Sequence, residues 1–274
     1  MAAESKDPIR ATDLGRPSTS TVPTPAVVKW ILLPLPVELD HLRVVLVDTR
    51  NPLNLGAAAR AMSNFGFLRL RVVNPYDVAF REARSAMGAA ELLASAEEYK
   101  SLAEAVADCA VVVGTTSIQH RDLQHPLRRL DEGAALIRQQ LTVAPVALLF
   151  GSEKFGLSND QLSHCHWLVN IPTRDEHVSM NLGQAVAVTL YELVRDNKTI
   201  EPPEFPQMAT AGDVERVTTS LLEALGISGY ATPETMAATE EKTRRLVRRK
   251  NLNARDAELC LGILRLILWK LRTG

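Results

Sequence analysis

Short apolar runs alternate with stretches of helical periodicity through the first two thirds of the chain. Each run is long enough for one strand, and each helical stretch repeats its apolar residues at helical spacing. The predicted strands cover residues 42–48, 68–73, 110–114, 146–150 and 167–171, and the predicted helices cover 54–65, 101–108, 131–140 and 181–195. This alternation is typical of a parallel sheet flanked by helices, so we expect one α/β domain over residues 41–196.

The pattern changes after this domain. Residues 197–211 are polar and are interrupted by prolines, which do not continue a helix, so this segment is predicted to be a linker. Helical periodicity then returns at 213–225, 234–249 and 254–271. The chain is therefore predicted to end in a small helical extension over residues 212–274.

Composition narrows the possible functions only through local features. The chain has 274 residues, of which 46% are hydrophobic, and its formal net charge is −1, so contact with nucleic acid needs clustered Lys and Arg. Cys109, Cys165 and Cys260 form no C-x-x-C pair, which argues against a disulfide framework or a Cys-rich zinc site and favours a reducing cytoplasm. Residues 1–40 are predicted to be a flexible N-terminal tail, and no apolar run is long enough to span a membrane.

The first chemical motif joins the first predicted strand to the first helix, over residues 47–60. Asn54 is predicted to cap the helix, and Gly56 with the alanines that follow allows another backbone to approach closely. Arg60, further along the same helix, can direct its guanidinium at a phosphate or a ribose. Taken alone, the motif is equally typical of a capped helix with a surface arginine.

The second motif follows the strand at 146–150. Gly151 and Gly156 flank Glu153, and two glycines at the end of a buried strand leave room for a ligand that lies against the backbone. A tight strand-to-helix turn with an exposed glutamate would have the same sequence, and taken alone the motif favours that interpretation.

The third motif combines residues 169–172 with residues 178–187. Ser179 and Asn181 stand where a long loop enters an Ala-rich helix, so either side chain can cap this helix. The positive end of the helix can also receive a carboxylate or another anion. Helix capping without any ligand is the simpler interpretation of this motif alone.

In this order and at these positions, the three motifs together resemble the signature motifs of the SpoU branch of SPOUT methyltransferases. The resemblance implies an α/β fold whose parallel sheet ends in a deep C-terminal trefoil knot and binds a bent S-adenosyl-L-methionine. By this resemblance the cofactor would be surrounded by Thr115, Thr116, Ser117, Gly151, Gly156, Ile171, Val178, Ser179 and Met180. A dinucleotide-binding fold is disfavoured, because no G-x-G-x-x-G follows the first strand.

The same resemblance assigns roles at the reacting end of the site. Glu153, Ser179 and Asn181 would shape this end, and Asn54 with Arg60 would face the substrate ribose. The family's usual scheme makes the arginine a general base, but a guanidinium keeps its proton near neutral pH. We therefore expect Arg60 to anchor a phosphate and stabilise charge, with proton removal by Arg60 as the alternative.

Within this family, the chain is most similar to enzymes that methylate the ribose of nucleotide 32 in the tRNA anticodon loop and carry a C-terminal helical extension. The resemblance implies tRNA as partner and a homodimer in which each subunit completes the other's site. Two alternatives stay open, because a fold does not specify its substrate. One is methylation of rRNA or of another tRNA ribose, and the other is a catalytically silent RNA-binding knot protein.

The helical extension offers its own candidate for RNA contact. The basic residues predicted to bind RNA there are Lys242, Arg244, Arg245, Arg248, Arg249 and Lys250, and the four arginines share one helical face. The alternative is a solvated helix face. A metal site is not expected at residues 164–166, because alternate residues of a strand point to opposite faces of the sheet.

Overall fold

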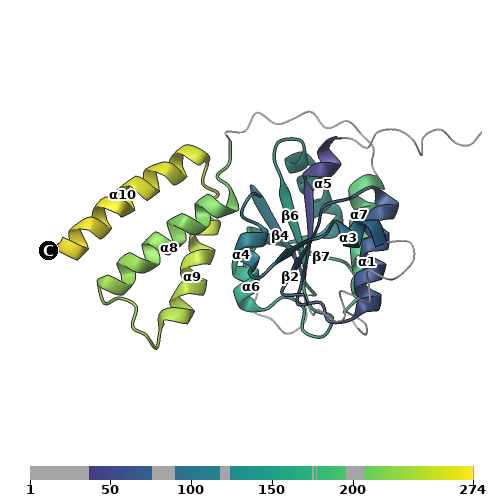
Figure 1. Ribbon diagram of the computed structural model, residues 1–274, viewed down its shortest axis with the longest axis horizontal. Coiled ribbons are helices and arrows are strands. Elements are labelled where there is room, and N and C mark those ends of the chain that lie inside the picture. Colours follow the sequence, from purple (N-terminus) through teal and green to yellow (C-terminus); the bar gives the residue numbers. More distant parts are fainter. Residues whose placement is uncertain are drawn as a thin grey trace, which may run out of the picture. The chain divides into compact units, whose positions relative to one another are not determined.

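The computed structural model describes residues 37–75, 90–117, 124–174, 176, 178–195 and 207–273. Within these residues seven strands form one sheet in the order β3-β2-β1-β6-β4-β7-β5, and every neighbouring pair is parallel. Figure 1 shows helices on both sides of this sheet. The strands are β1 (Leu42–Val47), β2 (Leu70–Val73), β3 (Glu97–Tyr99), β4 (Val111–Thr115), β5 (Leu127–Arg129), β6 (Val146–Phe150) and β7 (Trp167–Asn170). The predicted parallel α/β fold is confirmed.

Two apolar cores cover the two faces of this sheet. Alternate residues of β1 divide between them: Leu42, Val44 and Leu46 enter one core, and Val45 and Val47 enter the other. Burial on both faces explains why the central strands are continuous apolar runs in the sequence.

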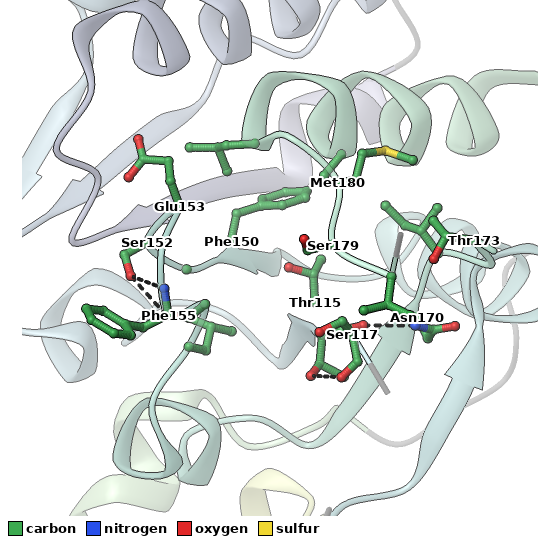
Figure 2. A pocket seen from close by; sticks show the side chains of 18 of the residues that line it. Thr115, Ser117, Phe150, Ser152, Glu153, Phe155, Asn170, Thr173, Ser179 and Met180 are labelled. Carbon is green, nitrogen blue, oxygen red and sulfur yellow. Dashed lines mark hydrogen bonds between the residues drawn. The ribbon is translucent and has the colours of Figure 1, made fainter. Parts of the chain in front are cut away.

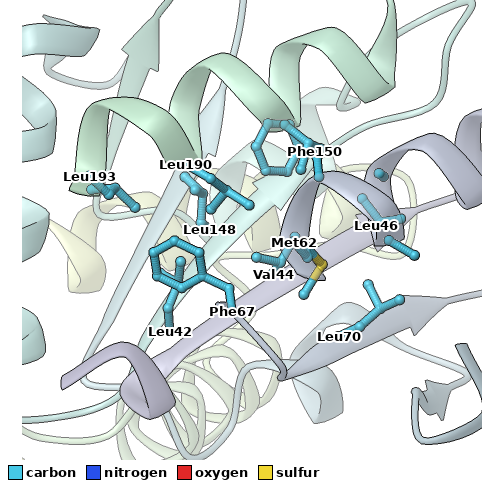
Figure 3. Packing of buried hydrophobic residues seen from close by; sticks show 14 of the residues in the cluster. Leu42, Val44, Leu46, Met62, Phe67, Leu70, Leu148, Phe150, Leu190 and Leu193 are labelled. Atoms are coloured by element: carbon cyan, nitrogen blue, oxygen red, sulfur yellow. The ribbon is translucent and has the colours of Figure 1, made fainter. Parts of the chain in front are cut away.

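Different helices complete the two cores. The first core includes residues of α1 (Pro52–Phe65), α3 (Ala90–Ala94), α5 (Leu130–Leu141) and α7 (Leu182–Arg195), and Figure 3 shows its packing. The second core includes residues of α4 (Leu102–Ala105), α6 (Asn159–Ser163) and the start of α8 (Ala211–Ile227). The two cores hold the strands, and therefore the loops at their ends, in fixed positions.

The strand order differs from the order along the chain in one informative way. The last two strands lie between earlier ones, with β6 between β1 and β4, and β7 between β4 and β5. The chain then enters α7, which packs on α1 so closely that a Cβ on Gly183 would lie 2.6 Å from that of Ala57. Late insertion of strands supports the trefoil knot, which stays a prediction. The expected close approach is made at Ala57, since a Cβ on Gly56 would meet open space.

Helices α8, α9 (Met236–Arg248) and α10 (Ala254–Thr273) form the predicted C-terminal extension, with a small core of their own. Two expected boundaries need correction. The 3-10 helix Val37–His41 stands directly before β1, inside the segment expected to be a tail to residue 40. Residues 207–211 belong to the extension rather than to the linker, because Ala209 is buried and Ala211 begins α8. Residues 1–36 and 196–206 lie outside the described residues.

Candidate functional site

A cavity of about 240 Å³ opens where three adjacent strands end. Strands β6, β4 and β7 are neighbours and run parallel, so the loops after Phe150, Thr115 and Asn170 meet at one edge of the sheet. Figure 2 shows side chains from these loops around the same cavity. The structure brings together at this cavity every residue that the sequence assigned to the cofactor: Thr115, Thr116, Ser117, Gly151, Gly156, Ile171, Val178, Ser179 and Met180.

Two glycines shape the wall formed by the loop after β6. A Cβ on Gly151 would lie 2.1 Å from the carbonyl carbon of Gly156, so no side chain fits there. Gly156 has a φ of 66°, in the left-handed region that favours glycine, and its N–H donates to the carbonyl of Ser152 over 2.8 Å. The loop is therefore folded back on itself, and the backbone rather than side chains forms this wall.

The other walls combine hydroxyl, amide and apolar groups. The Thr115 hydroxyl donates to the carbonyl of Leu149 over 2.9 Å, and Asn170 Nδ2 donates to the carbonyl of Thr116 over 3.1 Å, which fixes the two adjacent loops. Ile171 and Met180 contribute apolar surface. A backbone cradle with hydroxyls and apolar surface fits a nucleoside-like ligand such as S-adenosyl-L-methionine.

A hydrogen-bonded network joins the three motifs at one side of this cavity. The carboxylate of Glu153 accepts from the N–H groups of Arg50 and Asn51, over 3.3 and 3.2 Å, and from Asn54 Nδ2 over 3.1 Å. Asn54 Oδ1 in turn accepts from Asn181 Nδ2 over 2.9 Å. One residue from each motif thus belongs to a single chain of hydrogen bonds, although these residues lie far apart in the sequence.

One member of this network, Asn181, also caps the start of helix α7. Asn181 Oδ1 accepts from the N–H of Gly183 over 2.9 Å and from that of Gln184 over 3.4 Å, so Asn181 caps α7. The expected cap of α1 was wrong, because Asn51 rather than Asn54 holds that position and accepts from the N–H of Leu53 over 2.9 Å. Because Asn54 does not cap α1, its buried side-chain amide can link Glu153 to Asn181 by hydrogen bonds.

Arg60 is placed apart from this network. It lies six positions past Asn54 on α1, which rotates it by about 240° around the helix axis. Its side chain is exposed and is not among the residues that line the cavity. The structure therefore does not bring Arg60 and Asn54 to one ribose within a single copy of the chain, as the sequence led us to expect.

The predicted basic face of the extension also needs correction. Arg244 and Arg248 are buried against α6 and α8 rather than exposed on a common face. Arg244 pairs with Glu215 over 3.2 Å and with Asp160 over 3.4 Å, and Arg248 donates to the carbonyl of Ala211 over 3.2 Å. Arg244 therefore connects the extension to α6 of the α/β domain, whereas Arg248 bonds to α8 within the extension. Lys242 and Arg249 are exposed, and Arg245 is partly exposed.

The histidines beside this interface are buried and neutral. Burial, together with Arg244 and Arg248, lowers the pKa of His164 to about 3, and burial with Arg248 lowers that of His166 to about 3. His166 Nδ1 accepts from the N–H of Val112 over 3.0 Å, which fixes β7 beside β4. In the described part of the chain, no cluster of His, Cys, Asp and Glu is arranged to hold a metal ion.

Comparison with protein families gives one extended match. The model of the SpoU rRNA Methylase family matches residues 41–191, which contain all three motifs. The tRNA (cytidine/uridine-2'-O-)-methyltransferase TrmJ of Pectobacterium atrosepticum is 36% identical over 233 residues, covering 82% of this chain and 96% of its own length. The TrmJ protein of Sodalis glossinidius is 34% identical over 234 residues, covering 82% of this chain and 91% of its own.

Solved structures are also similar to this chain. The crystal structure of TrmJ from Z. mobilis superposes with a TM-score of 0.73 at 30% identity and covers 82% of this chain and 98% of its own. A methylase-family protein of Neisseria gonorrhoeae superposes with a TM-score of 0.60 at 30% identity and covers 68% of this chain and 97% of its own. Both similarities reach beyond the three motifs. In the described residues, none of the helices has the length and apolarity needed to cross a membrane.

Proposed function

The chain belongs to the SpoU rRNA methylase family, and on that premise we propose that it transfers a methyl group from S-adenosyl-L-methionine to a ribose 2'-hydroxyl of tRNA. The choice of tRNA is supported by relatives named tRNA (cytidine/uridine-2'-O-)-methyltransferases, whose similarity covers 82% of this chain. We further propose nucleotide 32 of the anticodon loop as the target. Support for that position comes from the sequence resemblance, which includes the C-terminal extension.

The observation that carries this proposal is the convergence of the three motifs on one cavity. The backbone at Gly151 and Gly156 and the loops at 115–117 and 178–180 would hold the cofactor. When bound there, S-adenosyl-L-methionine supplies a methyl group made electrophilic by its sulfonium. The rest of catalysis is positioning of the ribose hydroxyl and stabilisation of charge.

We assign different parts of this task, shaping the cavity and contacting the RNA, to different residues. One edge of the cavity is held in a single arrangement, because Asn54 donates a hydrogen bond to Glu153 and Asn181 donates one to Asn54. Arg60 remains free for substrate, since its guanidinium is exposed. We assign it to an RNA phosphate next to the reacting ribose, where its permanent charge stabilises the transition state.

We also propose that the protein acts as a homodimer through α1 and α7. These helices pack against each other, yet Leu53 is 79% exposed and Tyr191 is 51% exposed on them. Gly56 on the same helix faces open space. Exposed apolar groups beside a helical glycine suit close packing of a second copy, and Arg60 could then serve the partner's cavity. Light scattering should give the mass of a dimer, and a monomer at micromolar concentration would contradict this assignment.

The direct test of the activity is transfer of labelled methyl groups from S-adenosyl-L-methionine to purified RNA. Unmodified tRNA should accept label, and ribosomal RNA assayed in parallel should not. Label in rRNA alone would favour the alternative substrate. No transfer to either RNA, despite cofactor binding in calorimetry, would favour an RNA-binding protein without activity.

A further inference from the structure

A second cavity, of about 570 Å³, lies where α9 meets the α/β domain. Its walls come from the residues before β5, from α6 and from one side of α9. It is lined by Gln124, His125, Asn159, Leu162, Glu241, Lys242, Arg245 and Arg249. Three cationic side chains therefore face one carboxylate, so the cavity carries a positive charge although the whole chain does not.

The positive charge on this side of α9 is poorly compensated. Arg245 lies 3.6 Å from Glu241, a weak pair on the helix surface, and Lys242 and Arg249 are exposed. Arg244, about 100° from Arg245 around the helix axis, is bonded to Glu215, Glu240 and Asp160. One side of α9 therefore uses its arginines for packing, and the other leaves its cations available to a ligand.

His125 adds a buried polar group that has no hydrogen-bond partner among the described residues. Its side chain is only 8% exposed, and in the described part of the chain its buried Nε2 makes no hydrogen bond. Burial, together with Arg245 and Arg249, lowers the pKa of His125 to about 4, so the ring is neutral at physiological pH. A neutral ring protonated on Nε2 can donate to an anion, and burial without such a partner would be costly.

We propose that this cavity binds a phosphate of the tRNA backbone through Arg245, Arg249 and Nε2 of His125. Guanidinium groups bind phosphate oxygens through paired hydrogen bonds. A buried imidazole N–H can donate a further hydrogen bond to the same phosphate from another side. The cavity is close to the cofactor site along the chain, since Leu157 lines the first and Asn159 lines the second. This inference rests on the proposed tRNA substrate.

The test compares two charge-matched double variants. Arg245→Gln with Arg249→Gln removes both cavity arginines, and Arg255→Gln with Lys270→Gln removes two exposed cations that line no described cavity. The cavity variant should weaken tRNA binding about ten-fold and reduce the slope of log K against log salt by about 1. KM for tRNA should rise with kcat nearly unchanged, and cofactor binding should stay as in the wild type. His125→Phe should weaken tRNA binding in the same direction.

Two results would overturn the phosphate site. One is a tRNA affinity and salt slope equal in both double variants while the wild type still methylates tRNA. The other is unchanged tRNA affinity of the cavity variant combined with thermal stabilisation by inorganic phosphate in the wild type alone, which would indicate a free anion. Failure of the proposed function looks different, because the wild type itself would then neither bind nor methylate tRNA.

Discussion

The cavity proposed to hold the cofactor and the interface between α9 and the α/β domain differ in what shapes them. The cavity wall after β6 is shaped by backbone, with two glycines where side chains do not fit. The interface is shaped by charge, because the buried Arg244 of α9 bonds to Asp160 and Ser163 of α6 and also pairs with Glu215 of α8. The first region should therefore be sensitive to added volume, and the second to the loss of one charge from a compensated group.

The largest effect is expected from Gly151→Ala in the cavity. The added Cβ would lie 2.1 Å from backbone, so the loop must open. Cofactor affinity in calorimetry should fall more than about 100-fold, and overpacking should cost about 1 to 3 kcal/mol of stability. Gly262→Ala on α10, where a Cβ meets nothing within 4 Å, is the matched control and should bind cofactor normally. Cofactor binding by Gly151→Ala at the wild-type affinity would contradict the claim that backbone at Gly151 forms the wall of the cofactor site.

Arg60→Ala should come next, with methyl transfer reduced about 100-fold or more because a charge aimed at the transition state is removed. Cofactor binding should stay nearly intact, since Arg60 does not line the cavity. Arg60→Lys, which keeps the charge, should recover part of the rate. Unchanged transfer by Arg60→Ala would exclude a role in catalysis.

Arg244→Met tests the charged interface. Removing this arginine leaves the mostly buried Glu215 without one of its two arginine partners, so the free energy of unfolding should fall by about 3 kcal/mol. Arg249→Gln, on the exposed side of the same helix, should change stability by less than about 0.5 kcal/mol. Equal stability of the two variants in urea denaturation would mean that the interface is not held by charge.

The smallest effect concerns pH. His166 has a pKa of about 3 in the folded protein, against 6.5 for an exposed ring, so between these values the unfolded state binds the extra proton. Stability should therefore fall as pH is lowered through this window, by about 1 kcal/mol per such histidine from pH 6.5 to 5.5. Over that pH interval the free energy of unfolding of His166→Asn should fall by about 1 kcal/mol less than that of the wild type. An identical pH dependence in both proteins would show that His166 is not buried neutral.

The strand ends seen in the sequence predict which loops meet at the cavity, whereas the assignment of these loops to a cofactor rests on the resemblance of the three motifs to the SpoU family. Apolar runs ending at Phe150 and Asn170 give strand ends, and parallel strands bring their carboxyl ends to one edge of the sheet. The chain of hydrogen bonds from Glu153 through Asn54 to Asn181 could not be predicted, because it joins residues that only the folded sheet brings together.

Helix α9 shows a second limit. The spacing of its arginines gives a common face, but not whether that face meets solvent or protein. In the folded protein Arg244 and Arg248 face inward, where both pair with Glu215 on α8. The short elements α3, β3, β5 and α6 were also missed, since segments of three to five residues are too short for periodicity to be recognised.

Methyl transfer to tRNA transcripts that each carry one 2'-deoxy nucleotide tests the central claim most directly, because only the modified hydroxyl is removed. The wild-type protein should methylate the unsubstituted transcript and every singly substituted transcript except the one with deoxyribose at position 32. Loss of transfer at a different single position would move the target within tRNA. Full transfer to every deoxy transcript would contradict ribose 2'-O-methylation itself.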